Sequence, residues 1–261
     1  LFSQDSDFAS TEFVHETADV LTSYCVENSK DFPFLVILER LFDCMLILQH
    51  HDENYENVSK NYQWPKNMRT IINAFLKTRT ELLTDEMRKM LFRLAKEVLE
   101  VLDMDWFAFD VGLLVLLVRL VVVQTRMCLD KPESIDSENL AVCLFILEAA
   151  IRCAEDSSFL DDSAATQVAN SVQEAALYSI QYWVDAKEQN ESLSEEVEVL
   201  IYRFTCCLLA IGGAQMLPES LLRKCCERMI QIFEKSIAEK NFTTARLLLP
   251  NLDALPQLRD T

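Results

Sequence analysis

The segment from Val111 to Val123 contains thirteen residues and a single charge, that of Arg119. A membrane-spanning helix needs about 20 mainly apolar residues, but Asp110 bounds this run on one side and Gln124 and Arg126 close it on the other. An arginine at the centre of an isolated span would also be energetically costly. The pattern therefore predicts no transmembrane segment, and instead a helix of a soluble protein that is buried around most of its circumference.

The few polar positions of this segment are regularly spaced. Gly112, Arg119 and Arg126 recur every seven residues, which is two helical turns, so they lie along one narrow edge of the helix. Such an edge is typical of the inner helices of stacked-helix arrays, which line a concave surface. We predict that Arg119 and Arg126 belong to a protein-binding groove for a peptide or a partner helix. The alternative is that both arginines pair with acidic side chains of adjoining helices.

Glycine is scarce, with three glycines and six prolines in 261 residues, whereas glycine makes up about 7% of average proteins. The chain therefore has little material for hairpin turns, phosphate-binding loops or dinucleotide motifs. Apolar residues recur at helical spacing between the stop signals, and no convincing strand is found. Helix pairs recur every ~40 to 55 residues, within reach of armadillo and HEAT periods. The predicted fold class is all-α, an armadillo/HEAT-like α-solenoid of about ten helices.

Start and stop signals place these helices along the chain. Thr84 is expected to cap one helix, Ser192 with Glu195 forms a capping box for another, and Gly212-Gly213 ends that one. We expect one solenoid segment over 1–261 with a weak joint near 187–194. The helices are expected at about 10–28, 34–48, 65–79 and 85–101, along the stretch from 112 to 130, at 137–155 and 162–187, and from the capping box at 192 to 211, with one after 218 and a tenth from 242 that two prolines shorten.

The charge balance and the absence of motifs exclude several classes of function. With 42 acidic and 24 basic side chains the net charge is −18, and we find no cluster of Lys and Arg of the kind that binds nucleic acid. An acidic surface maintains solubility and favours basic partners. HExxH, GxSxG, Walker-type and kinase signatures are missing. We therefore predict no enzyme, no cofactor and no small-molecule substrate; the all-helical enzyme is kept as a third hypothesis.

The histidines do not predict a metal site. The chain has three, at His15, His50 and His51, and the last two stand in a polar loop beside Asp52 and Glu53. Neighbouring residues cannot usually all face one ion, and no other histidine exists to complete a tetrahedral site.

Nine cysteines, an odd number without a CxxC motif, stand mostly in apolar helical segments. This pattern indicates reduced, mostly buried thiols in a cytosolic protein. The adjacent pairs Cys206-Cys207 and Cys225-Cys226 could accept palmitate, but we expect one buried and one partly exposed thiol in each pair. The chain starts without an initiator methionine and without a signal peptide, so we expect it to be a piece of a longer protein.

Four segments resemble the central part of the neurochondrin family in order and spacing: LAKEVLEVLDMDWF, LVRLVVVQTRMCLD, VCLFILEAAIRCAEDSSFL and VQEAALYSIQYWVDA. Asp105-Trp106 closes the first of these helices, and Arg126 lies near the end of the next. Glu148 falls inside the third, and Ala175 with Tyr182 marks the fourth. The resemblance can be followed from about residue 51 to about residue 234.

The resemblance implies an armadillo-like α-solenoid that acts as a cytoplasmic, non-catalytic adaptor. It further implies roles in neuronal signalling, dendrites and neurite outgrowth, and negative regulation of calcium/calmodulin-dependent kinase II. Receptor tails, and endosomal membranes reached through palmitoylation of the full-length protein, are implied as further contacts, although the family's palmitoylated cysteines match no position here. The alternative is a purely structural section of a larger helical scaffold whose binding surface lies outside this fragment.

Overall fold

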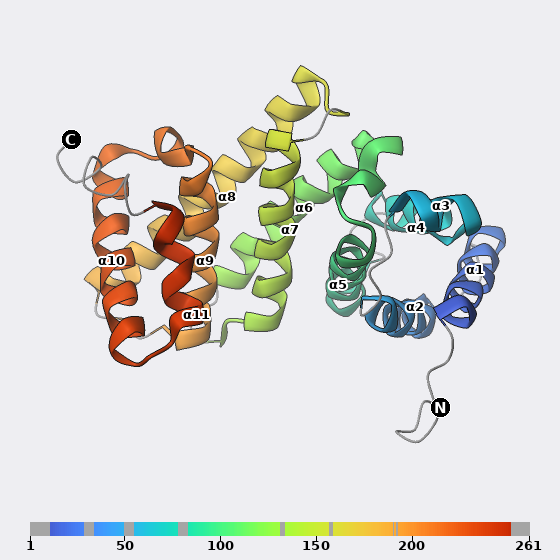
Figure 1. Ribbon diagram of the computed structural model, residues 1–261, viewed down its shortest axis with the longest axis horizontal. Helices are drawn as coiled ribbons and strands as arrows, with labels where there is room; N and C mark the ends of the chain where they lie inside the picture. Colours follow the sequence, from blue (N-terminus) through green and yellow to red (C-terminus); the bar gives the residue numbers. More distant parts are fainter. Residues whose placement is uncertain are drawn as a thin grey trace. The chain divides into compact units, whose positions relative to one another are not determined.

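A computed structural model describes residues 11–28, 34–49, 55–77, 83–130, 134–156, 159–189, 191 and 193–251. Every regular element within these ranges is helical, which confirms the all-α prediction (Figure 1). The chain divides into two compact units, residues 1–117 and 118–261, and the boundary falls inside one long helix. The stacking of the helices into a solenoid, the single segment and the joint near 187–194 stay predictions.

The first unit is built from four packed helices and two short ones. Helix α1 packs on α2 and α4, α2 packs on α5, and α4 also meets α5, so these four helices surround one core (Figure 1). The elements of this unit are α1 (Thr11–Glu27), α2 (Phe34–Leu48), α3 (Tyr55–Asn61), α4 (Trp64–Leu76), α5 (Asp85–Leu102), the 3-10 helix η2 (Met104–Phe109) and the start of α6 (Val111–Leu129).

Helix α4 is fixed to α1 by its apolar face and by its first residue. Asp19 of α1 accepts a hydrogen bond from the backbone N–H of Trp64, which satisfies one of the free donors at the start of α4. The buried indole of Trp64 donates to His15 Nδ1 at 3.0 Å, and His15 stacks on Tyr62 with 4.4 Å between ring centroids. The buried face of α4 is made of Trp64, Pro65, Met68, Arg69, Ile71, Ile72, Phe75 and Leu76.

The link between α5 and α6 folds as the 3-10 helix η2, which the sequence did not predict. Its Trp106 is fully buried, and the indole N–H donates to the carbonyl oxygen of Pro65 at 2.8 Å. In return, Arg69 Nη1 donates to the carbonyl oxygen of Trp106 at 3.0 Å. These two bonds join η2 to the N-terminal half of α4 and place Phe109, at the end of η2, beside that helix.

Helix α6 contains the apolar run. Its exposed residues are Gly112, Arg119, Val123 and Met127, which follow one edge, while Arg126 is partly buried. The predicted edge is therefore exposed at two of its three positions, Gly112 and Arg119. Among the described residues, α6 is the one helix that is long and apolar enough to cross a membrane, and half of its most apolar window is buried in the fold. A core helix meets the same two criteria.

The second unit packs α7 against α8 and α9, α8 against α9 and α10, and α10 against α11. The predicted tenth helix is a short α11 followed by a 3-10 turn that contains Pro250. The elements of this unit, besides the rest of α6, are α7 (Ser137–Asp156), α8 (Asp162–Glu188), α9 (Glu195–Ala210), the 3-10 helix η4 (Gly213–Met216), α10 (Glu219–Ala238), α11 (Phe242–Ala245) and the 3-10 helix η5 (Arg246–Asn251).

Two of the three helix boundaries predicted from capping and stop residues agree with the structure. Thr84 caps α5, and its side chain accepts from the backbone N–H of Met87. Helix α9 ends before Gly212, whose φ of +79° is favourable only for glycine among common residues. The cap of α9 was predicted wrongly: the helix begins after Ser194, whose side chain accepts from Val197 N, because the acidic first turn starts at residue 195. Ser192 lies outside the described residues.

The cysteines are all free, and eight of the nine are buried. The pair Cys206-Cys207 has one buried and one partly exposed member, as predicted. For Cys225-Cys226 the prediction is wrong, because both side chains are fully buried. Helix α10 is covered on two sides, by α8 and by α11, so neighbouring positions on it can both face protein.

One buried carboxylate in the second unit forms an ion pair. Glu148 of α7 is 4% exposed and accepts from Arg203 of α9 through Nη2 at 2.6 Å and Nε at 3.1 Å. Burial raises the pKa of Glu148 above 4.5, and the charge and hydrogen bonds of Arg203 oppose this rise without cancelling it.

The cap of α5 should have a measurable effect on stability. We expect Thr84→Ala to lower the free energy of unfolding by about 1 kcal/mol, because the N–H of Met87 loses its acceptor. Thr166→Ala is the matched control, since that hydroxyl bonds back to the carbonyl of Asp162 and caps no free donor. Urea denaturation followed by circular dichroism measures both variants. Equal effects would show that Thr84 does not act as a cap.

The raised pKa of Glu148 predicts a pH dependence of stability. The folded state holds the proton of Glu148 more tightly than the unfolded state, so its contribution to stability is present at low pH and is lost as pH rises above about 4.5 through the folded pKa. We expect Glu148→Gln to flatten the fall in unfolding free energy between mildly acidic and neutral pH. Glu138→Gln, at an exposed position of the same helix, is the control and should leave the profile of the wild type unchanged.

Candidate protein-binding surfaces

Arg119 lies on the exposed edge of α6, as the sequence predicts. Its guanidinium donates through Nη2 to Oε1 of Gln167 in α8 at 2.8 Å. The partner is a neutral amide, so the alternative prediction of an acidic partner is not met at this position. The full positive charge of Arg119 is therefore presented at the surface of the second unit.

Arg126, two turns further along the same edge, is engaged within the fold. It forms an ion pair with Glu174 of α8, with 2.9 Å between Nη2 and Oε1. Its guanidinium lies over the ring of Tyr178 at 5.3 Å from the centroid, and Tyr178 donates its hydroxyl to Asp130. That hydrogen bond is the largest of the causes that raise the pKa of Tyr178 to about 12. For Arg126, therefore, the alternative prediction of an acidic partner on an adjoining helix is met. A protein-binding role for the two arginines stays a prediction.

A second surface escaped the sequence analysis, which found no cluster of basic residues. The stretch from Asn57 to Thr80 contains five basic residues and no acidic one. In a chain with 42 acidic side chains, a stretch of this length without an acid could have indicated the basic surface. Most of this stretch is α4, whose exposed residues lie opposite its buried apolar face.

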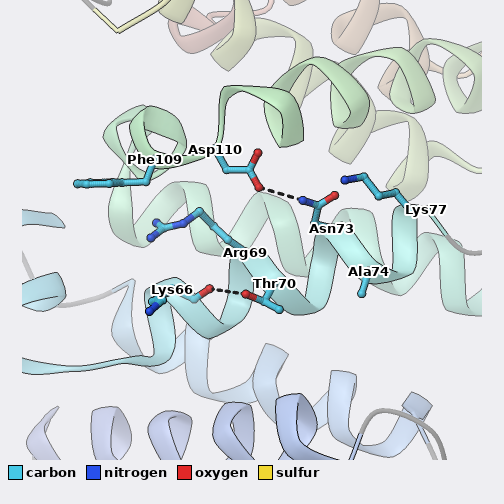
Figure 2. Close-up of a pocket in the computed structure, with 8 residues that line it drawn as sticks. All are labelled: Lys66, Arg69, Thr70, Asn73, Ala74, Lys77, Phe109 and Asp110. Carbon is cyan, nitrogen blue, oxygen red and sulfur yellow. Dashed lines mark hydrogen bonds between the residues drawn. The ribbon is translucent and has the colours of Figure 1, made fainter.

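The outer face of α4 borders a pocket of about 530 Å³, shown in Figure 2. We call the six α4 residues of this lining the α4 basic face; Phe109 and Asp110 complete the wall from the end of η2. Phe109 is 74% exposed, and the guanidinium of Arg69 lies 5.4 Å from the centroid of its ring. The α4 basic face consists of Lys66, Arg69, Thr70, Asn73, Ala74 and Lys77.

Asp110 is the acidic residue of this lining, and both of its carboxylate oxygens accept hydrogen bonds. Asn73 Nδ2 donates to Oδ2 at 2.9 Å (Figure 2), and the backbone N–H of Leu113 donates to Oδ1 at 3.0 Å. The second bond caps the first turn of α6, where a negative charge is stabilised by the helix dipole. Asp110 is thus held in place for structural reasons, and its charge is partly compensated.

The two lysines of the α4 basic face are exposed and form no ion pair with any described residue. About half of the described lysines and arginines do form such an ion pair. Ten described cations pair with described carboxylates, namely Arg40, Lys60, Arg88, Lys96, Arg126, Arg203, Arg223, Lys224, Arg228 and Lys235.

The histidines give no candidate metal centre in the part of the chain that the structure describes, where no group of three or more potential ligands is found. His15 is buried, and its ring packs between Tyr62 and Trp64. Residues 50 to 53, for which the sequence predicts no metal site, lie outside the described residues.

Comparison with known proteins gives one result. A family model described as Neurochondrin matches residues 7–258, nearly the whole chain and the sequence of both compact units. No curated protein and no solved structure matches the chain.

The different environments of the two α6 arginines predict different effects on stability. Arg119→Glu should change the free energy of unfolding by no more than about 0.5 kcal/mol, because it replaces an exposed side chain bonded to an amide. Arg126→Glu should lower it by about 1 kcal/mol, because a carboxylate would then face Glu174 and the ring of Tyr178. Urea denaturation at low salt measures both; the opposite order would contradict the described contacts.

Proposed function

The chain belongs to the neurochondrin family, and from this premise we propose that it is a non-catalytic helical adaptor that binds protein partners. The family was correctly identified from the sequence. The observation that carries a binding role is the α4 basic face, where Lys66 and Lys77 are exposed and form no ion pair with a described residue, in a chain whose net charge is −18. A surface whose charge is opposite in sign to the net charge of the molecule favours selective association with a partner of complementary charge.

The chemistry of the pocket supports binding rather than catalysis. Asp110 uses both oxygens for hydrogen bonds within the fold, and the other charged residues of the lining are cations. A general acid–base mechanism needs a titratable group that can reach its substrate with a suitably placed proton. The buried acid Glu148 belongs to the second unit and is engaged there with Arg203.

The finer roles implied by the family resemblance belong to the same proposal. They are neuronal signalling and neurite outgrowth, negative regulation of calcium/calmodulin-dependent kinase II, and a cytoplasmic location that includes dendrites. Association with endosomes would be a property of the full-length protein. Membership of the family supports the adaptor role in general, and these particular roles extend it.

A purely structural role is the second candidate. The engagement of Arg126 with Glu174 and Tyr178 favours it, because the predicted groove residue serves to join α6 to α8. On this hypothesis the segment holds a larger scaffold together, and the partner binds elsewhere in the longer protein.

The two candidates differ in an assay with purified calcium/calmodulin-dependent kinase II. We expect the 261-residue chain to lower the rate at which the kinase phosphorylates a peptide substrate, and to bind the kinase in a direct titration. A full-length member of the family is the positive control. Inhibition by the full-length protein alone would favour the structural role. Failure of both proteins to bind the kinase would overturn the proposed regulation.

A further inference from the structure

We propose that the α4 basic face binds an extended acidic peptide segment, with one carboxylate at Lys66 and another at Lys77. This inference rests on the proposed adaptor function and names the kind of partner that this surface fits. It differs from the expectation drawn from net charge, which favoured basic partners. The difference arises because the local charge of α4 is opposite to that of the chain.

The charge distribution supports an acidic ligand at this position. Residues 57–80 contain no acid, whereas the chain as a whole carries a net charge of −18. An acidic segment is therefore repelled by most of the surface and attracted by this face, which favours selectivity and fast association. Lys66 and Lys77 are exposed, and binding a carboxylate would not require either to leave an internal ion pair.

The spacing of the two lysines sets the spacing of the ligand's acids. They are eleven residues apart, which is close to three helical turns, so they lie on the same side of α4. At a rise of 1.5 Å per residue their Cα atoms are ~16 Å apart along the helix axis. An extended peptide advances about 3.3 Å per residue, so two acids about five residues apart would reach both lysines.

The surface between the lysines offers polar and apolar contacts. Thr70 and Asn73 lie between them along α4, as Figure 2 shows. Phe109 exposes most of its ring next to Arg69 at one side of the pocket. Large exposed aromatic side chains are enriched at protein contacts because they bury much area at small entropic cost. We therefore expect an aromatic or aliphatic residue beside one of the ligand's acids.

Asp110 works against an acidic ligand, and its surroundings limit that effect. Both oxygens accept hydrogen bonds, one from Asn73 and one from the first turn of α6. The carboxylate is thus held between Asn73 of α4 and the first turn of α6 (Figure 2), while Lys66 and Lys77 occupy exposed positions of α4. The face has two exposed lysines and the buried cation Arg69 against this single acid.

A synthetic peptide tests the inference directly. The probe is a short fluorescein-labelled peptide of glycine and serine with two glutamates at the derived spacing and a phenylalanine beside the first. It is titrated with the 261-residue chain at low salt, and carbodiimide then joins its carboxylates to the lysines that they contact. We expect cross-links at Lys66 and Lys77. The matching peptide with glutamines should bind at least about tenfold more weakly.

Two charge-reversed variants complete the design. Lys66→Glu with Lys77→Glu should weaken peptide binding at least about tenfold. Lys187→Glu with Arg246→Glu reverses two exposed cations that form no ion pair with described residues, so it makes the same change of net charge in the other unit. It should keep the cross-links and the affinity of the wild type. Circular dichroism verifies that both variants keep their helices.

Several outcomes would overturn the inference. Cross-links at other lysines, or equal loss in both variants, would show that the peptide binds by general charge. Stronger binding of inorganic phosphate or of a single-stranded oligonucleotide would identify another ligand class. A dimer of the chain that Lys66→Glu with Lys77→Glu converts to monomer would identify a second copy as the occupant. Failure of the wild-type chain to bind the acidic peptide, with kinase binding retained, would leave the adaptor function standing and refute only this site.

Discussion

The burial of Trp106 against α4 determines the geometry of the first unit's candidate site. The indole donates to the carbonyl of Pro65, and the backbone of Trp106 accepts from Arg69, so η2 and α4 are joined in both directions. Both bonds are shielded from water, where an unmade hydrogen bond is most costly. The same contacts place Phe109 and Asp110 beside the outer face of α4. A pocket forms there because the short 3-10 helix η2 is held on α4 by these two buried hydrogen bonds.

Part of the charge in this chain is used in ion pairs that join helices to one another. Ion pairs connect α7 with α9 through Glu148 and Arg203, and α6 with α8 through Arg126 and Glu174. Where cations are used in this way, they stabilise packing and offer little to a partner. The exposed lysines of α4 form no such pair, in keeping with the lack of acids on their own helix. Local composition, rather than net charge, therefore indicates where a partner would bind.

The exposed edge of α6 contains one arginine that faces solvent and borders another that pairs within the fold. Its apolar residues are mostly buried, and Gly112, Arg119, Val123 and Met127 form the exposed strip. The heptad spacing predicted Gly112 and Arg119 on this strip, because the geometry of a helix is fixed by its backbone, but it did not predict Val123 and Met127. It did not predict that Arg126 would turn to Glu174 while Arg119 meets only an amide, since those partners come from a helix almost fifty residues further on.

The sequence by itself determined the helices, their approximate bounds, the cap at Thr84 and the stop at Gly212, and the family. These depend on interactions within a few residues, which spacing and residue type reveal. The tertiary structure decided the rest. It buried both members of Cys225-Cys226 and folded η2 onto α4. It also paired Arg126 with Glu174, whereas the exposed lysines of α4 form no ion pair with a described residue. Each of these outcomes depends on which helices pack together. The periodicity of a short segment carries no information about its contacts with distant segments.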